Sequence, residues 1–388
     1  MYNALNFHDL RRAARSRLPS SIFEYIDRGT EDENSLRDTH QSLACLKITP
    51  HVLTAGSIRD TTTTLFGKRY SAPIVVAPTA CAGLVWHKGE IALAQAAQAS
   101  GIPFCAATEA MTSIDDIVRG TSSEHIWFQL YVWENEQLSH ELIRRVQALG
   151  VQTLVVTIDT PVAPNREYNT RNGMGMPFKI SPKLIADVAT HPSWLLNVLV
   201  KYLMDAGVPR FANYPDEYRT TLIRGGKSPE VHHNSNLSWD LIKTIRDLWK
   251  GQLVLKGILH PDDALKAVEH GVDGIIVSNH GSRNLDSAIS PIDALDALCA
   301  AVKGQMTIIM DSGIRRGSDI FKALALGADA VMIGRGFLYG TALGGKSGAE
   351  HTYSLYLDEL KITMASAGCA TLGDIRQAEI SRVGARES

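Results

Sequence analysis

The sequence predicts an α/β fold, a (β/α)8 TIM barrel with an N-terminal helical extension and a long insertion after strand 4. Three observations lead to this fold class. From residue 72 onward, eight short apolar runs alternate with amphipathic helical segments. The runs are continuously apolar, which is typical of a parallel sheet that helices cover on both faces. No Gly-x-Gly-x-x-Gly follows the first run, which argues against a doubly wound dinucleotide-binding sheet.

Eight strands and the helices between them can be placed by residue number. The expected strands are Ile74–Ala77, Phe104–Ala107, Ile126–Leu130, Thr153–Asp159, Leu253–Gly257, Gly274–Asn279, Thr307–Gly313 and Ala330–Arg335. Helical patterns between them include Lys88–Ser100, Glu136–Leu149, Trp239–Trp249, Pro261–His270 and Gly317–Leu326. Eight strand–helix units match a closed barrel rather than an open sheet of five or six strands.

Two segments depart from the regular alternation. The extension before the barrel is expected to hold two short helices, Phe7–Ser16 and Ser20–Arg28, and otherwise irregular structure. The gap of 170–237 carries several prolines, more than one crossover helix tolerates, so we expect an insertion that forms a lid over the catalytic face. Both belong to one expected domain, 1–388.

Composition limits the partners. A net charge of -2 gives no electrostatic reason to expect nucleic acid, so a small molecule is the expected partner. The five cysteines lie far apart and fit neither a zinc site nor a disulfide framework, which suits a reducing compartment. The first residues lack the order of a signal peptide, and no apolar run reaches about 18 residues. We therefore expect a cytoplasmic protein without a metal.

One apolar segment, 194–204 within the insertion, leaves two interpretations open. It is too short to span a bilayer. It is either a helix packed on its own protein or in an oligomer contact, or a segment that lies in a membrane interface. The second interpretation would place the protein peripherally, at the inner face of the membrane.

Polar residues stand where seven of the expected strands end. Active-site residues of such barrels come from these ends and the loops that follow them. The last two loops, 311–317 and 334–336, combine glycines with arginines. Glycine lets backbone amides approach a phosphate, and arginine adds a two-pronged donor. These loops predict a cofactor that carries a phosphate, with surface charges beside a tight turn as the alternative.

Motifs across about residues 5–380 resemble the FMN-dependent 2-hydroxy-acid oxidases and dehydrogenases, a family that includes glycolate oxidase, lactate oxidase, bacterial L-lactate dehydrogenase and (S)-mandelate dehydrogenase. The matching motifs are Leu18-Pro19, Phe23-Glu24-Tyr25, Ala77-Pro78-Thr79-Ala80, Trp127-Phe128-Gln129-Leu130-Tyr131, Thr157-Ile158-Asp159, Leu255-Lys256-Gly257, Ser278-Asn279-His280-Gly281, Asp311-Ser312-Gly313, Arg315-Arg316-Gly317-Ser318-Asp319 and Gly334-Arg335. Segments 126–133 and 311–327 look most like mandelate dehydrogenase, whereas 172–174 and 191–194 look like bacterial lactate dehydrogenase.

The resemblance implies a catalytic set for the oxidation of an (S)-2-hydroxy acid. His280 would be the base, since imidazole has an ordinary pKa near neutrality, and Asp159 would orient it. Arg283 and Arg166 would bind the substrate carboxylate with their planar forks. Tyr25 and Tyr131 would hydrogen-bond the carboxylate and the substrate oxygen.

The resemblance also implies FMN as the cofactor and assigns residues to it. Lys256 would stabilise the anionic reduced ring, and Asp311 would contact the ribityl chain. The full set expected to contact FMN is Pro78, Thr79, Ala80, Thr108, Gln129, Thr157, Lys256, Ser278, Asp311, Gly313, Arg315, Gly334 and Arg335.

Three positions depart from the family pattern. Ala107 stands where serine is common, so one flavin hydrogen bond is lost or is taken over by Thr108. Glu109 follows at a position that is often aromatic or small; it is either exposed or paired, or it reads a polar or cationic group on the substrate. Asn284 replaces a usual glutamine, which we expect to matter little.

Substrate and acceptor stay open at this point. We expect a mandelate- or lactate-like acid, with a quinone or oxygen as the electron acceptor, and a homotetramer. An isomerase that uses reduced flavin would need the phosphate loops but not the set of His280, Arg283 and Arg166. A flavin-binding protein without catalytic activity would be expected to have lost His280 or Arg283.

Overall fold

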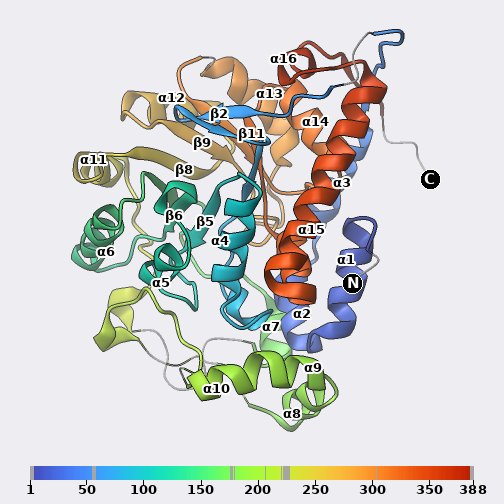
Figure 1. Cartoon of the computed structure of the whole chain (residues 1–388). Helices are drawn as coiled ribbons and strands as arrows, with labels where there is room; N and C mark the ends of the chain where they lie inside the picture. Colours follow the sequence, from blue (N-terminus) through green and yellow to red (C-terminus); the bar gives the residue numbers. More distant parts are fainter. Residues whose placement is uncertain are drawn as a thin grey trace.

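The computed structural model describes residues 4–54, 58–174, 178, 180–205, 207–219, 221, 228–302 and 304–384. Its centre is a closed barrel of parallel strands in the order β10-β11-β4-β5-β6-β7-β8-β9. Helices surround the barrel, as Figure 1 shows. The expected (β/α)8 barrel is therefore confirmed.

The strands correspond to the eight expected runs. Two of them, Phe104–Ala107 and Ile126–Leu130, have the expected bounds, and the other six differ at one end or both. They are β4 (Ile74–Val76), β5 (Phe104–Ala107), β6 (Ile126–Leu130), β7 (Thr153–Thr157), β8 (Gln252–Ile258), β9 (Gly274–Val277), β10 (Thr307–Asp311) and β11 (Ala330–Ile333). The expected strands that reached Asp159, Asn279, Gly313 and Arg335 were too long. Asp159, Asn279 and Gly313 lie past the ends of their strands, and Arg335 is the first residue of the helix α15 (Arg335–Ala367).

A separate apolar core fills the inside of the barrel. It includes Val75, Cys105 and Trp127, and a hairpin of β2 (Thr63–Leu65) and β3 (Lys68–Tyr70) contributes Leu65 to it. Phe66 at the turn of this hairpin packs edge-on against Trp127, with 5.6 Å between the ring centroids. The hairpin, which the sequence did not predict, thus packs on the interior core at the amino-terminal end of the barrel and leaves the other end for a site.

The outer helices lie between the strands, as expected. Those that follow strands are α4 (Gly89–Ala99), α5 (Ile114–Arg119), α6 (Glu136–Ala148), α11 (Trp239–Leu248), α12 (Pro261–Glu269), α13 (Pro291–Ala301), α14 (Gly317–Ala325) and α15 (Arg335–Ala367). Gly344 and Gly345 leave helical backbone angles and kink α15. Past α15, α16 (Leu372–Ile375) precedes β12 (Ile380–Arg382), which pairs antiparallel with β1 (Leu46–Ile48).

The described part of the N-terminal extension contains three helices where two were expected. The helices α1 (Phe7–Arg17) and α2 (Ser20–Asp27) confirm the prediction, and α3 (Asn34–Cys45) lies in a part expected to be irregular. Leu36 and Leu43 are spaced by seven residues, but the polar residues between them hid the pattern. In Figure 1, α1 and α2 run beside α15.

The insertion folds largely into short helices, although residues 175–177, 179, 206, 220 and 222–227 lie outside the described part. The helices are α7 (Glu167–Arg171), α8 (Pro182–Ala189), α9 (Pro192–Trp194), the π-helix η3 (Leu195–Val200) and α10 (Lys201–Asp205). Trp194, Val198 and Tyr202 are buried, and the Trp194 indole donates to the Leu84 carbonyl oxygen at 2.6 Å. One face of 194–204 thus packs on its own protein, and Leu196, Leu203 and Met204 are exposed. No described helix combines the length and apolar character needed to cross a membrane.

Candidate active site

A large cavity lies at the carboxyl ends of the barrel strands. Its volume is about 1220 Å³, which exceeds the roughly 300–1,000 Å³ of a typical ligand site and leaves room for a cofactor and a small acid together. The N-terminal extension adds Tyr25 and His40 to its wall, and the end of the insertion adds Pro229 and His233. The insertion therefore contributes to the wall of the site.

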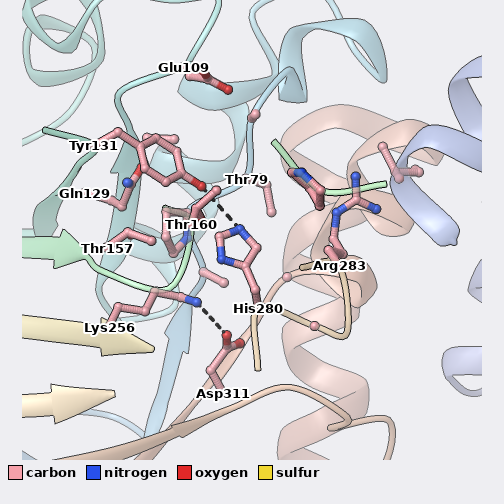
Figure 2. Close-up of a pocket in the computed structure, with 18 of the residues that line it drawn as sticks. Thr79, Glu109, Gln129, Tyr131, Thr157, Thr160, Lys256, His280, Arg283 and Asp311 are labelled. Atoms are coloured by element: carbon pink, nitrogen blue, oxygen red, sulfur yellow. Dashed lines mark hydrogen bonds and ion pairs between the residues drawn. The ribbon is translucent and has the colours of Figure 1, made fainter. Parts of the chain in front are cut away.

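His280 lines this cavity, and its ring faces the Tyr131 hydroxyl (Figure 2). Its Nδ1 atom lies 2.8 Å from Asp159 Oδ1, and its Nε2 atom lies 3.2 Å from the Tyr131 hydroxyl. Burial lowers the pKa of His280 and outweighs the opposite effect of Asp159, so the ring is neutral at physiological pH. A neutral imidazole held in this way can accept a proton at Nε2.

The loop after β9 holds His280 in a backbone conformation that side chains rarely adopt. The φ angles of His280, Gly281 and Ser282 are 59°, 65° and 60°, all in the left-handed region. Each amide is satisfied by a side chain: His280 donates to Ser278 Oγ at 3.0 Å, and Gly281 donates to Ser312 Oγ at 2.8 Å. Ser282 donates to Asn279 Oδ1 at 3.1 Å. Strain of this kind is typical of functional sites, where the surroundings must impose it.

Two arginines lie beside the base without a carboxylate partner among the described residues. The Arg283 guanidinium lies 5.4 Å from the centroid of the Tyr25 ring and donates to the Arg28 carbonyl oxygen at 2.8 Å. Arg166 donates to the Arg283 carbonyl oxygen at 3.0 Å. Burial, with a further effect of Arg283, lowers the pKa of Arg166 to about 10, so it remains charged near neutrality. This half of the cavity is built to receive an anion.

The two tyrosines of the site keep their protons. Burial raises the pKa of both Tyr25 and Tyr131, and the Glu109 carboxylate raises both further. Each hydroxyl is therefore neutral and can donate a hydrogen bond to a substrate oxygen.

A buried lysine lies below the base, in contact with an aspartate and a serine. Lys256 Nζ lies 2.9 Å from Asp311 Oδ2 and 2.9 Å from Ser278 Oγ, and Ser278 donates to Asp311 at 2.6 Å. Burial opposes the charged form of Lys256, but Asp311 and Asp159 outweigh burial and raise its pKa. A permanent positive charge thus sits on the floor of the cavity.

Two parts of the cavity fit a flavin that carries a phosphate. One holds a polar side chain without a partner, and the other holds a cluster of cationic side chains. Gln129 Nε2 is buried without a hydrogen-bond partner in the described part, and Thr79 and Thr157 line the same wall. Farther along the cavity, His40 Nε2 is likewise buried and unpartnered among the described residues. Burial and then the cations of Arg315 and Arg335 lower the pKa of His40 to about 3. An anionic group at this end would relieve the repulsion among these cations.

Most of the expected site residues line this one cavity. They are Tyr25, Pro78, Thr79, Ala80, Gln129, Tyr131, Thr157, Arg166, Lys256, His280, Arg283, Asp311, Gly313, Arg315, Gly334 and Arg335. Asp159 and Ser278 lie behind its wall, in contact with His280 and Lys256.

Thr108, which was expected to contact the cofactor, is not among the residues that line the cavity. It is fully buried, and its hydroxyl donates to the Gln129 carbonyl oxygen at 2.7 Å and accepts from the Tyr131 amide at 3.0 Å. Ala107 lines the cavity instead. The hydroxyl is used to join the ends of β5 and β6, so Thr108 positions Gln129 and Tyr131 rather than facing the cavity.

Several residues of the cavity were not expected from the sequence. His40 was missed because α3 was not recognised, and His232 and His233 lie in a stretch with no regular pattern.

Asn284 was expected to matter little. Its side chain donates to the Asp159 carbonyl oxygen and to Thr160 Oγ1, both at 2.8 Å, so it fixes the loop that carries the aspartate.

Comparisons with known proteins agree with this geometry. A family model described as FMN-dependent dehydrogenase matches residues 14–382. The chain is 38% identical to an L-lactate dehydrogenase of Allorhizobium ampelinum, covering 95% of this chain and 96% of that protein. It is 36% identical to an (S)-mandelate dehydrogenase of Pseudomonas putida, covering 95% and 91%. A solved structure of the monotopic membrane protein (S)-mandelate dehydrogenase superposes with a TM-score of 0.89 at 34% identity, covering 97% of this chain and 99% of that one.

Proposed function

The chain belongs to the FMN-dependent dehydrogenase family, and on this premise we propose that it oxidises (S)-2-hydroxy acids to 2-oxo acids at the cavity described above. The observation that carries the proposal is the place of His280 between Asp159 and Tyr131, with Arg283 on the same loop. A base and a carboxylate anchor three residues apart suit a substrate whose reacting carbon bears a carboxylate.

Each group of the site then has a role toward the substrate. Arg283 and Arg166 bind the carboxylate, and the hydroxyls of Tyr25 and Tyr131 bind the substrate oxygens. His280 accepts a proton from the substrate, and Asp159 stabilises the imidazolium that results.

FMN supplies an acceptor for the two electrons that the substrate loses. Gln129, Thr157, Thr79, Ala80 and Pro78 would lie against the ring. Lys256 would stabilise negative charge on the ring, because a fixed cation in a buried site acts strongly on charge that develops beside it. Asp311 would hold the ribityl chain, and Gly313, Arg315, Gly334 and Arg335 would hold the phosphate. His40, which lines the same end of the cavity, would join the residues that hold the phosphate.

The similarities to lactate and mandelate dehydrogenases make L-lactate and (S)-mandelate the first substrates to test. We further propose that the electrons pass to a quinone and that the protein is peripheral to the inner face of the membrane. Exposed apolar residues of the insertion support this contact, and so does the likeness to a monotopic membrane protein. In Figure 1, α8 to α10 form one edge of the molecule. Lys183 and Lys201, exposed on the same helices, would favour anionic lipids.

Two further proposals concern organisation. The extension, barrel and insertion all contribute residues to one cavity, so we treat residues 1–388 as a single FMN-binding domain. The family resemblance alone supports a homotetramer.

The test of the function mixes the FMN-loaded protein anaerobically with L-lactate, (S)-mandelate and a wider panel of (S)-2-hydroxy acids. Substrate oxidation should bleach the visible flavin absorbance. A protein that retains FMN and is bleached by no member of the panel would disprove the proposal. His280→Ala should keep FMN and lose bleaching; a variant that is bleached at the normal rate would contradict the role of His280. Repeating the reaction in air with peroxide detection separates oxygen from quinone as the acceptor.

A further inference from the structure

A carboxylate and an imidazole form a polar wall at the substrate end of the cavity. Glu109, two residues after the end of β5, lines the cavity with only 13% of its side chain exposed. Its Oε1 atom accepts a hydrogen bond from the Tyr214 hydroxyl at 3.2 Å and lies 3.1 Å from His233 Nε2. The sequence left two alternatives for Glu109: it is exposed or paired, or it reads a polar or cationic group on the substrate. The structure shows a paired Glu109 that also lines the cavity.

The ring of Tyr131 lies between this wall and the catalytic histidine. His233 stacks on Tyr131 with 4.1 Å between the centroids and 17° between the planes. The Tyr131 hydroxyl lies 3.2 Å from His280 Nε2. Figure 2 shows Glu109 beyond Tyr131, on the side away from Lys256 and Asp311. Glu109 and Tyr131 line the same cavity as the arginines that face the substrate carboxylate, so a bound substrate can reach the Glu109 carboxylate.

Small side chains leave room in front of this wall. Ala80 and Ala107 both line the cavity, and the Cys81 amide donates to the Glu109 carbonyl oxygen at 3.4 Å, which brings the loop after β4 beside Glu109. A substrate whose carboxylate is bound at Arg283 and whose hydroxyl is near Tyr131 would direct a longer side chain toward Glu109.

We propose that Glu109, positioned by His233, binds a hydrogen-bond donor at the end of the substrate side chain. The preferred substrates are then (S)-2-hydroxy acids whose side chain ends in a hydroxyl or an ammonium group. A carboxylate offers only acceptors, with room for several hydrogen bonds, so a donor on the substrate can bind to it beside the partners that it already has. A side chain that ends in a second carboxylate would be repelled. This inference rests on the proposed function.

The test compares matched pairs of substrates by anaerobic flavin bleaching of the FMN-loaded protein. One pair is (S)-6-amino-2-hydroxyhexanoate and (S)-2-hydroxyhexanoate; the other is (S)-4-hydroxymandelate and (S)-mandelate. Within each pair, kcat/KM should be at least about tenfold higher for the donor-bearing acid, because a hydrogen bond to a charged group contributes that much. Glu109→Gln keeps the shape of the side chain and removes its charge. In this variant the ratio of kcat/KM for (S)-6-amino-2-hydroxyhexanoate to that for (S)-2-hydroxyhexanoate should fall at least about tenfold. Glu141→Gln, an exposed carboxylate on α6, should leave both ratios unchanged.

The outcomes separate this inference from the function on which it rests. Bleaching by hexanoate and mandelate derivatives with no preference for the donor-bearing members would overturn the role of Glu109 and leave the oxidation intact. An equal preference in wild type and Glu109→Gln would do the same. Absence of bleaching by every acid would instead overturn the proposed function. The visible spectrum of bound FMN in Glu109→Gln reports whether that variant is folded.

Discussion

The Nδ1 atom of His280 lies 2.8 Å from Oδ1 of Asp159, although 121 positions separate the two residues in the chain. The bond joins the loop after β9 to the loop after β7, which lie on opposite sides of β8 in the barrel. Burial lowers the pKa of His280, and Asp159 acts in the opposite direction. The balance keeps the ring neutral while a carboxylate stands ready to stabilise its charged form.

Replacing Asp159 with asparagine should lower the rate of flavin bleaching and move its pH dependence. The base works in its neutral form, so the rate rises with pH through the pKa of His280. Loss of the carboxylate lowers that pKa further, so the rise should occur at lower pH, while the plateau falls roughly 100-fold or more. Stopped-flow bleaching across the acid to neutral range measures both effects. A rise displaced to higher pH would contradict the electrostatic role of Asp159.

Arg283→Lys should weaken substrate binding while FMN stays bound. Lysine keeps the charge but lacks the planar fork that matches a carboxylate, so KM should increase about tenfold or more. Arg144→Lys, at an exposed position on α6, is the control and should behave as wild type. Equal KM values for Arg283→Lys and wild type would exclude Arg283 as the carboxylate anchor.

Gly257→Ala should displace the Asp159 side chain, because the added methyl group would overlap it. Gly257 has a φ of +112°, and a Cβ at this position would lie 2.4 Å from the Asp159 Cβ. Gly304 offers a matched control, since its φ is +73° but nothing lies within 4 Å of the position that a Cβ would take there. Gly304→Ala should cost only about 1–2 kcal/mol of unfolding free energy, the usual cost of a left-handed alanine. Gly257→Ala should cost more and also slow bleaching. Equal effects of the two variants on stability and on bleaching would show that the contact with Asp159 is unimportant.

Exposed apolar residues of the insertion should determine vesicle binding. Leu203 and Met204 are 54% and 83% exposed on α10, so the double variant Leu203→Ser/Met204→Ser should bind less to phosphatidylglycerol-containing vesicles in a flotation assay. Leu265→Ser/Ile362→Ser removes exposed apolar residues from α12 and α15 and should bind as wild type does. If wild type itself fails to float with the vesicles, or if both double variants lose binding equally, α10 is not the contact.

The local pattern of the chain was enough for the barrel. Continuous apolar strands have few alternatives to a parallel sheet covered by helices, so all eight strands could be located, with errors only at their ends. Polar residues at the carboxyl ends of those strands indicated where the site lies, and the family resemblance supplied the roles of its residues. Carboxyl ends of parallel strands meet at one end of a barrel, so residues such as Lys256, His280 and Asp311 must converge.

The tertiary structure decided what depends on side chains far apart in sequence. Thr108 was expected at the cofactor, but its hydroxyl is used between β5 and β6, a choice that depends on the neighbouring strand rather than on its own segment. His233 could not be connected with Glu109 and Tyr131, because it lies in an irregular part of the insertion with no period to reveal its direction. The amphipathic order of the chain determined the barrel and the end at which its chemistry lies. Packing between distant segments decided which partner each polar group of the cavity has, because a buried polar group must find its hydrogen bond wherever the fold supplies one.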